Sequence, residues 1–300
     1  MSTNLSAWCT GENAFQWLST SVEPPAVADV FPNSFYLRTA SGDLINVTGK
    51  EVRSPINVNI GTGGPDFQEA VKVGERAEFG GGVLSVGPLR VAITEGRFTN
   101  SLRPEEAKKE KVVSVKGKLL AAACLLVVFD LKESILDAGG KAFDRYRSFF
   151  MDAFVRPTTF DESLFMESAY GLLGIGSGFT PSFDDFVSGF LCMYNAGNRF
   201  FRRAPLIMDI AEAERRTSWA SARLLDYMQH DLMDEDVEAV VSSFFAGDGD
   251  GLLLGLEDVV SRGHSSGLDM SVGMLVASSV VLDDLDHGSF TSNLVRSMGF

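Results

Sequence analysis

The sequence predicts an α+β protein with a small antiparallel β sandwich or barrel-like N-terminal part, residues 1–103, and a larger all-helical C-terminal domain, residues 104–300. Three observations support this prediction. Apolar and polar residues alternate between about residues 33 and 94, where glycine clusters mark frequent turns. A charge run at residues 104–111 then separates this part from the rest. Beyond it, apolar residues recur at helical spacing and no strand pattern is convincing.

The N-terminal part is predicted to hold one short helix and several short strands. The helix covers residues 12–19 and precedes Pro24-Pro25. Residues 35–39 and 44–47 form a predicted hairpin that turns at Ser41-Gly42-Asp43. Further strands are predicted at residues 56–60, 83–86 and 89–93, with glycine-rich turns between them.

The C-terminal part is predicted to hold eight helices. The first, residues 119–129, is the longest apolar run of the chain and is predicted to be a buried helix, because it is too short to span a bilayer. The apolar spacing predicts the other helices at residues 134–154, 163–173, 183–194, 211–228, 234–245, 252–260 and 269–282.

Composition excludes several classes of partner. A formal net charge of −14 makes a nucleic-acid backbone or an anionic membrane surface a poor partner. The first residues lack the basic and apolar regions of a secretion signal. The three cysteines are far apart, as expected of reduced side chains and not of a disulfide frame or a zinc site. We therefore expect a soluble, cytoplasmic protein.

The most informative stretch is the glycine-rich segment that leads into the predicted helix at residue 183. Its glycines permit positive φ, and a helix N-terminus behind them suits an anion or a carbonyl oxygen. Thr180, or alternatively Ser182, is expected to cap the helix, and a plain helix–helix connection remains the other interpretation. Asp185 is the candidate catalytic residue, and the candidate binding residues are Gly176, Ser177, Gly178, Thr180, Ser182 and Asp184.

A second segment, residues 263–273, repeats this pattern of glycines, hydroxyls and an acid at a helix start. We expect the two helix starts to face each other across a shared pocket. His264 is the candidate general acid or base, and a hydrogen-bonded loop residue is the equally weighted alternative. The candidate binding residues here are Ser265, Ser266, Gly267 and Asp269.

Between the two segments, residues 215–221 combine arginines with hydroxyls. Arg216, Thr217 and Ser221 are candidates for holding a carboxylate or phosphate, and Thr217 and Ser221 fall one helical turn apart. The alternative is an ordinary exposed helix start. No phosphate loop, dinucleotide fingerprint, His-Glu-x-x-His or Cys-x-x-Cys motif occurs in the sequence. We expect no cofactor and no resident metal, although a Mg²⁺ ion on the adjacent aspartates stays open.

Taken together, Gly174–Gly189, Arg216–Ser221 and Gly263–Asp269 resemble the AllH-like family, formerly labelled putative carboxylases. The family's usual first motif is approximately Gly-Leu-Gly-Pro-Gly-Leu-Thr-Pro-Ser-Gly-Asp-Asp-Phe-Leu, and its last is Gly-His-Thr-Ser-Gly. The likeness spans roughly residues 30–285. Two positions differ: Ser177 stands where the family usually has Pro, and Phe183 where it has Gly. A ring at Phe183 is expected to narrow the mouth of the loop.

The resemblance implies a subunit of the oxamate carbamoyltransferase of allantoin (purine) breakdown. We therefore expect a carbamoyltransferase subunit that acts on a small ureido or oxamate-like acid. Its expected partners are a small anionic or carbamoyl-bearing metabolite and other subunits of the complex. The alternatives are a non-catalytic metabolite-binding or assembly protein, and a magnesium-dependent hydrolase or transferase that uses the aspartates.

Overall fold

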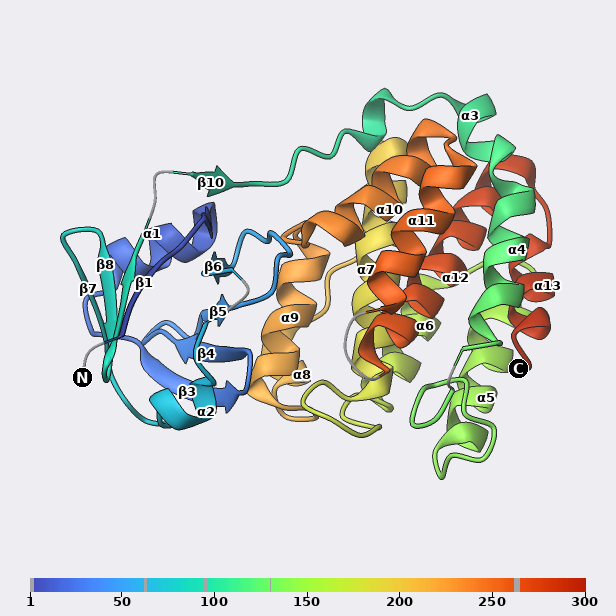
Figure 1. Cartoon of the computed structure of the whole chain (residues 1–300). Helices are drawn as coiled ribbons and strands as arrows, with labels where there is room; N and C mark the ends of the chain where they lie inside the picture. The colour runs from blue at the N-terminus through green and yellow to red at the C-terminus, as the bar shows by residue number, and fades with distance from the viewer. Residues whose placement is uncertain (1–2, 62–63, 94–95, 130, 262–264) are drawn as a thin grey trace. The chain divides into compact units, whose positions relative to one another are not determined.

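The computed structural model describes residues 3–61, 64–93, 96–129, 131–261 and 265–300 (Figure 1). The chain forms two compact units, of which the first comprises Met1–Ser101 with Leu232–Glu235 and the second Leu102–Asp231 with Asp236–Phe300. Strands occur in the first unit and helices dominate the second, so the predicted α+β class is confirmed.

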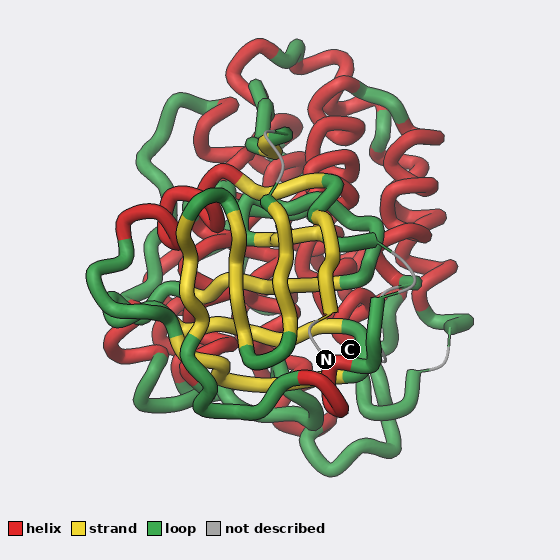
Figure 2. The backbone as a smooth tube through the Cα atoms, turned by 60° about the vertical axis from the view of Figure 1, so that its left-hand side comes forward, coloured by secondary structure: helices red, strands yellow, loops and turns green. Residues whose placement is uncertain are grey.

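The first unit holds two β-sheets, which Figure 2 shows as two layers whose strands cross. One sheet has the strand order β1-β9-β8-β7 and the other β10-β2-β6-β5-β4-β3. The strands are β1 (Thr3–Ser6), β2 (Cys9–Gly11), β3 (Ala26–Phe31), β4 (Ser34–Arg38), β5 (Leu44–Thr48), β6 (Asn57–Asn59), β7 (Ala77–Gly80), β8 (Val83–Val86), β9 (Leu89–Ala92) and β10 (Arg97–Phe98). Two short helices, α1 (Glu12–Thr20) and α2 (Phe67–Ala70), complete the unit.

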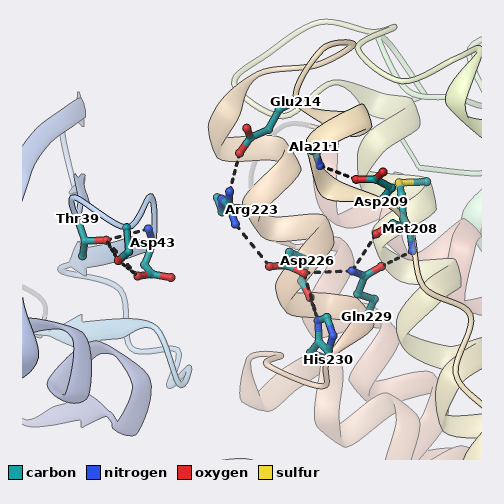
Figure 3. A network of polar contacts seen from close by, with 11 residues as sticks. Thr39, Asp43, Met208, Asp209, Ala211, Glu214, Arg223, Asp226, Gln229 and His230 are labelled. Atoms are coloured by element: carbon teal, nitrogen blue, oxygen red, sulfur yellow. Dashed lines mark hydrogen bonds and ion pairs between the residues drawn. The ribbon is translucent and has the colours of Figure 1, made fainter.

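The predicted hairpin is confirmed as β4 and β5, which pair antiparallel with Arg38 opposite Leu44. At its turn the Asp43 backbone N–H donates to Thr39 Oγ1 at 2.9 Å, and Thr39 Oγ1 donates to Asp43 Oδ2 at 3.1 Å (Figure 3). Alternate residues of these strands, Phe35, Leu37, Ile45 and Val47, enter one apolar core shared by both sheets.

Strand pairing is mixed, which corrects the expectation of an antiparallel, barrel-like sheet. β5 pairs parallel with β6, β1 with β9, and β10 with β2, and neither sheet closes on itself. Asn46 Nδ2 donates to Asn57 Oδ1 at 3.0 Å across the parallel β5–β6 pair. The β1–β9 and β10–β2 pairs join strands that are distant in sequence, and an alternating pattern within one strand does not show which strand lies beside it or in which direction.

The second unit contains the remaining helices. They are the 3₁₀ turn η1 (Pro104–Glu106), α3 (Lys109–Ser114), α4 (Lys116–Leu126), α5 (Phe143–Phe150), the π-helical turn η2 (Met151–Val155), α6 (Glu162–Tyr170), α7 (Ser182–Phe200), α8 (Ile210–Ala213), α9 (Trp219–Gln229), α10 (Glu235–Ala246), α11 (Gly249–Val260), α12 (Ser266–Asp286) and α13 (Phe290–Ser297). No helix among the described residues is long and apolar enough to cross a membrane.

Two long helices, α7 and α12, lie side by side at the centre of this unit (Figure 1). Gly273 of α12 faces the backbone of α7, because a Cβ there would lie 2.0 Å from the carbonyl oxygen of Phe186. A Cβ on Gly189 of α7 would lie 2.1 Å from the carbonyl oxygen of Met270. Further along, a Cβ on Gly197 would meet Val281. Gly189 of α7 thus lies near Met270 of α12, and Gly197 lies near Val281, so the helices run parallel and their N-termini lie at the same end.

Three helix predictions need correction. Residues 134–142 do not join α5, because Ser134 and Ile135 are buried in a non-helical segment and Gly139-Gly140 follows. The predicted helix 211–228 is interrupted between α8 and α9, where the Ser218 hydroxyl accepts from Ser221 N and starts α9. The apolar run at 119–129 is buried on one face only.

Candidate functional site

Asp184, in the first turn of α7, joins the glycine-rich segment to the start of α9. Its Oδ1 accepts a hydrogen bond from the backbone N–H of Gly174 at 2.8 Å. Its Oδ2 accepts from the hydroxyl of Ser221 at 2.6 Å and from the hydroxyl of Thr217. The two hydroxyls therefore meet at one internal carboxylate, but Thr217 precedes α9, which begins at Trp219, so they do not share a helix face as predicted. Burial raises the pKa of Asp184, and the hydrogen bonds of Ser221, Thr217 and Gly174 oppose that rise.

The next residue, Asp185, points toward the start of α12. Thr180 Oγ1 donates to Asp185 Oδ2 at 3.0 Å and lies 3.1 Å from Ser266 Oγ. The side chains of adjacent residues on a helix diverge by about 100°. Asp184 therefore contacts the start of α9, and Asp185 points toward the start of α12. The structure thus brings the two predicted segments together at the N-termini of the parallel helices.

Asp269, in the first turn of α12, is the most deeply buried acid of the site, with no exposed surface. Its Oδ1 accepts from the backbone N–H of Ile135 at 2.7 Å. Its Oδ2 is buried without a hydrogen-bond partner among the described residues, although the hydroxyls of Ser182, Ser134 and Ser265 lie near enough to lower the pKa. This oxygen is therefore free to accept one further hydrogen bond.

The three buried carboxylates hold protons more tightly than aspartates in water. Burial raises the pKa of Asp269 to about 7, against the hydrogen bonds just described. Burial also raises the pKa of Asp185 well above its ordinary value, and the charges of Asp269 and Asp184 raise it further. Among the described residues, it is hydroxyls and backbone N–H groups that stabilise the ionised forms. The site can therefore both hold a proton and accept hydrogen bonds near neutral pH.

The glycine-rich segment needs its glycines, as predicted. Gly174, Gly176 and Gly178 have φ angles of 79°, 132° and 96°. A Cβ on Gly174 would lie 2.3 Å from the carbonyl oxygen of Arg216, and one on Gly176 would lie 2.3 Å from Ser182 N. One N–H group of the helix start is used internally, since Phe183 N donates to the carbonyl oxygen of Ile175 at 3.1 Å.

Neither predicted hydroxyl caps α7. The N-cap residue is Pro181, and no side chain accepts a bond at that end. Thr180 instead contacts Asp185, and Ser182 Oγ donates to the carbonyl oxygen of Glu133 at 2.7 Å. Ser265 is the N-cap residue of α12, again without a side-chain cap bond. These hydroxyls make tertiary contacts, because buried carboxylates and a neighbouring segment compete for them.

Residues 133–135, which the sequence analysis did not single out, lie against both helix starts. Glu133 has a φ of 66°, a left-handed conformation that strains a residue other than glycine. Its carboxylate accepts from Ser177 Oγ at 3.0 Å, its carbonyl oxygen accepts from Ser182, and two residues on Ile135 donates to Asp269. The sequence pattern placed residues 134 and 135 in a predicted helix, so it gave no sign that this segment supports the site.

Tyr146 of α5 also supports the site and was missed. Its hydroxyl donates to the carbonyl oxygen of Ile175 at 3.0 Å. Burial, with the nearby charges of Asp269 and Asp184, raises its pKa to about 12. Its ring stacks on Phe183, with centroids 5.9 Å apart. Phe183 is fully buried and also meets Phe149, so its ring fills the core below the loop and does not narrow the mouth.

Two other predicted residues are placed differently or not at all. The guanidinium of Arg216 is paired with Glu212, through Nε at 2.7 Å, and also donates to the carbonyl oxygen of Tyr170. It would have to leave Glu212 before it could bind a substrate anion. His264 lies outside the described residues. Gly267 is described and buried, and its carbonyl oxygen accepts from Ser271 Oγ at 2.8 Å.

The far end of α9 is fixed by a separate polar network (Figure 3). Gln229 accepts from Met208 N at 2.8 Å and donates to Asp226 at 3.1 Å. Asp226 also contacts His230, and Arg223 bridges from Asp226 to Glu214. Since α9 presents Ser221 to Asp184 from its first turn, this network holds the helix that positions the site.

The predicted pocket shared by the two helix starts stays a prediction. A pocket of about 450 Å³ lies elsewhere, at the C-terminal end of α12, and is lined by residues of 153–160 and 280–292. Within the described part of the chain, no group of three or more His, Cys, Asp and Glu side chains has the arrangement of a metal site.

Residues 172–278 match the family model described as oxamate carbamoyltransferase subunit AllH. This region is similar to the AllH family, and we call residues 172–278 the AllH region. The AllH region starts at the glycine-rich segment and contains Asp184, Asp185, Ser221 and Asp269. Glu133, Ile135 and Tyr146 support it from outside the matched residues. No curated protein and no solved structure matches the chain.

Proposed function

We propose that the chain is a subunit of a carbamoyltransferase-type enzyme that acts on a small ureido or oxamate-like acid in allantoin nitrogen catabolism. The observation that carries this proposal is the meeting of two helix N-termini and three buried aspartates inside the AllH region. The family description names a subunit of oxamate carbamoyltransferase. We extend that activity to this chain as a member of a complex.

The residues suit the hydrogen-bonding needs of a carbamoyl group. Its NH₂ is a double donor, and the unpartnered Oδ2 of Asp269 and the carboxylate of Asp185 are acceptors. Its carbonyl oxygen needs donors, which we assign to N–H groups of the Gly176–Gly178 turn at the start of α7. Ser177, Thr180, Ser265 and Ser266 would contribute hydroxyls on the two sides of the ligand.

The chemical step is transfer of the carbamoyl group from phosphate to an amide nitrogen. The nitrogen attacks the carbamoyl carbon, negative charge develops on the carbonyl oxygen, and phosphate leaves with its bonding electron pair. The proton of the attacking nitrogen goes to a base, which we assign to Asp185 or His264. N–H groups fixed before the reaction would stabilise the developing oxyanion. Arg216 would bind the anionic end after exchanging Glu212 for substrate.

A non-catalytic role is the second candidate, and one observation favours it. Asp184 is fully engaged inside the protein by Gly174, Thr217 and Ser221. Such bonds stabilise the fold regardless of any substrate. A metabolite-binding or assembly subunit would need the same rigid helix starts but would not catalyse a reaction.

The test compares Asp185→Asn and His264→Ala with the wild type, each alone and with the other subunits. Calorimetric titration measures binding of carbamoyl phosphate, oxamate and phosphate. Transfer of a labelled carbamoyl group from carbamoyl phosphate to oxamate measures turnover, with and without EDTA to decide the magnesium-dependent alternative. The matched control is Asp258→Asn, because Asp258 is an exposed acid of α11.

A catalytic role predicts that both variants assemble normally and lose at least a hundredfold in turnover. An assembly role predicts instead that the complex fails to form while the control assembles. If neither the chain nor the complex binds any of the three ligands, the carbamoyltransferase assignment is wrong.

A further inference from the structure

Helix α4 is apolar on both of its faces. Its inner face is buried against α11, α12 and α13 through Leu119, Ala122, Ala123 and Leu126. The opposite face is exposed, and we define the α4 face as Leu120, Ala121, Cys124, Leu125, Val128 and Phe129. A helix that is hydrophobic all round is normally covered all round. The buried helix that the sequence predicts is therefore only half covered by this chain.

The exposure is concentrated on this face. Val128 is 75% exposed, Leu125 52%, Phe129 43% and Leu120 41%. These four residues stand among ten exposed large hydrophobic residues in the described part of the chain. Leu120 and Leu125 lie on the outer side of α4, and Val128 and Phe129 follow directly after the helix ends at Leu126, so the exposed apolar residues extend past the C-terminus of the helix. Figure 1 shows α4 at the flank of the helical unit.

The face has the character of a helix-docking surface. Contiguous apolar patches of several hundred Å² on a monomer usually mark interaction sites. Ala121 and Cys124 are small, so a partner helix can approach α4 closely between Leu120 and Leu125. Anchors four residues apart suit an amphipathic helix laid along the face.

The segment that carries the face has a net positive charge, opposite in sign to the charge of the whole protein. Residues 108–132 contain six lysines and two acids, in a chain whose net charge is −14. Lys116 pairs with Asp286 at 3.7 Å and Lys118 with Asp250 at 2.7 Å. Even with these two aspartates counted, the lysines outnumber the acids. A partner surface with acidic residues beside its apolar residues complements this rim.

A second copy of the chain fits less well than a different polypeptide. In a two-fold contact the same patch meets itself. Lysines lie on both sides of the face in sequence, at Lys116 and Lys118 and again at Lys132. Parallel or antiparallel pairing of two α4 helices would therefore bring lysines near lysines, which opposes association.

We propose that the α4 face docks an amphipathic helix of a different polypeptide, with apolar residues bordered by Asp and Glu, supplied by another subunit of the complex. The proposal rests on the proposed function in its choice of partner, because the family description calls its members subunits. The α4 face supplies affinity and the lysine rim selects an acidic partner.

The experiment mixes the purified chain with the purified other subunits and measures complex mass by light scattering and Kd by calorimetry. Leu125→Glu and Val128→Glu are each expected to weaken binding at least tenfold, and Lys118→Glu to weaken it and reduce its salt dependence. The matched control, Leu164→Glu, changes an exposed leucine of α6 and is expected to leave Kd unchanged. Circular dichroism confirms that each variant is folded.

Cys124 provides an independent readout. It is exposed, whereas Cys9 and Cys192 are buried. Its reaction with a thiol reagent such as DTNB is expected to slow at least tenfold in the complex. The proposal is overturned if Leu125→Glu leaves the complex and the protection of Cys124 intact, while the subunit assignment then stands. It is also overturned if no complex forms, or if the chain alone is a dimer that Leu125→Glu converts to a monomer.

Discussion

Thr180 Oγ1 lies 3.1 Å from Ser266 Oγ, which joins two segments 86 residues apart in the chain. The same Thr180 hydroxyl donates to Asp185 at 3.0 Å, and Ser266 also lowers the pKa of that carboxyl. The start of α7 and the start of α12 therefore share one hydrogen-bond network. That network depends on the parallel packing of the two helices further along their length.

The first prediction concerns this link. Thr180→Val and Ser266→Ala each remove a hydroxyl near the buried Asp185, so each is expected to lower the free energy of unfolding by about 1–2 kcal/mol. Because the two residues touch, their effects should not add, and a double-mutant cycle should give a coupling of about 1 kcal/mol. Urea unfolding measures all four proteins.

The control cycle pairs Thr180→Val with Ser292→Ala, because Ser292 lies in α13, where its hydroxyl donates to the carbonyl oxygen of Ser289 at 3.1 Å. That pair is expected to be additive within about 0.5 kcal/mol. Additivity of Thr180→Val with Ser266→Ala would contradict the shared network.

The second prediction concerns the close packing of α7 and α12. Gly273→Ala would place its Cβ 2.0 Å from the carbonyl oxygen of Phe186. The backbone of α7 would have to move to relieve this clash, which costs free energy. We expect a loss of about 3 kcal/mol or more in the free energy of unfolding. Gly117→Ala is the control, since its Cβ would meet nothing within 4 Å and alanine favours a helix. It is expected to stabilise by about 0.5 kcal/mol, and equal effects of the two changes would rule out the packing argument.

The third prediction concerns Phe183, which the sequence analysis placed at the mouth of the loop. Its ring is fully buried against Tyr146 and Phe149. Phe183→Ala is therefore expected to cost about 3–5 kcal/mol of stability. Calorimetry with oxamate should show no gain in affinity for the folded variant. A tighter Kd without loss of stability would restore the original interpretation.

Sequence patterns predicted the elements whose side chains alternate or repeat regularly. The hairpin of β4 and β5, the helices α7 and α12, and the positive φ of Gly174 are of this kind. Each is fixed by local propensity, or by an apolar face that is visible in one stretch of residues. The sequence also predicted that the two helix starts lie close together, because both segments share one pattern, but it did not predict the contact between Thr180 and Ser266.

What the sequence could not show depends on distant partners. Glu133 has a left-handed backbone conformation, and its segment makes hydrogen bonds with Ser177, Ser182 and Asp269. No local sequence motif predicts these contacts. The hydroxyl of Ser182 was one of two candidates to cap α7. It donates instead to the carbonyl oxygen of Glu133, which is distant in sequence. For α4, an all-apolar stretch cannot reveal which of its two faces the chain leaves uncovered.

The last prediction concerns Asp269 and the pH dependence of stability. Burial raises its folded-state pKa to about 7, above its ordinary value of 3.8. Between these pH values the folded state keeps a proton that the unfolded state has lost. The stability from this group is therefore complete below about pH 3.8 and is lost as the pH rises through about 7. The free energy of unfolding should fall by about 1.4 kcal/mol per pH unit in that window because of this residue.

Asp269→Asn cannot titrate, yet its side-chain oxygen can still accept from Ile135 N, 2.7 Å from Oδ1 in the wild type. Between pH 4.5 and 6.5, the decrease of its unfolding free energy with pH should be smaller than that of the wild type. The difference between the two slopes should be about 1.4 kcal/mol per pH unit. Asp185 contributes in the same direction and remains in both proteins, so a smaller slope persists in the variant. Asp258→Asn, on the exposed face of α11, should keep the wild-type slope. Parallel curves for wild type and Asp269→Asn would show that Asp269 is ionised throughout this pH range. Asp269 would then not hold a proton near neutral pH.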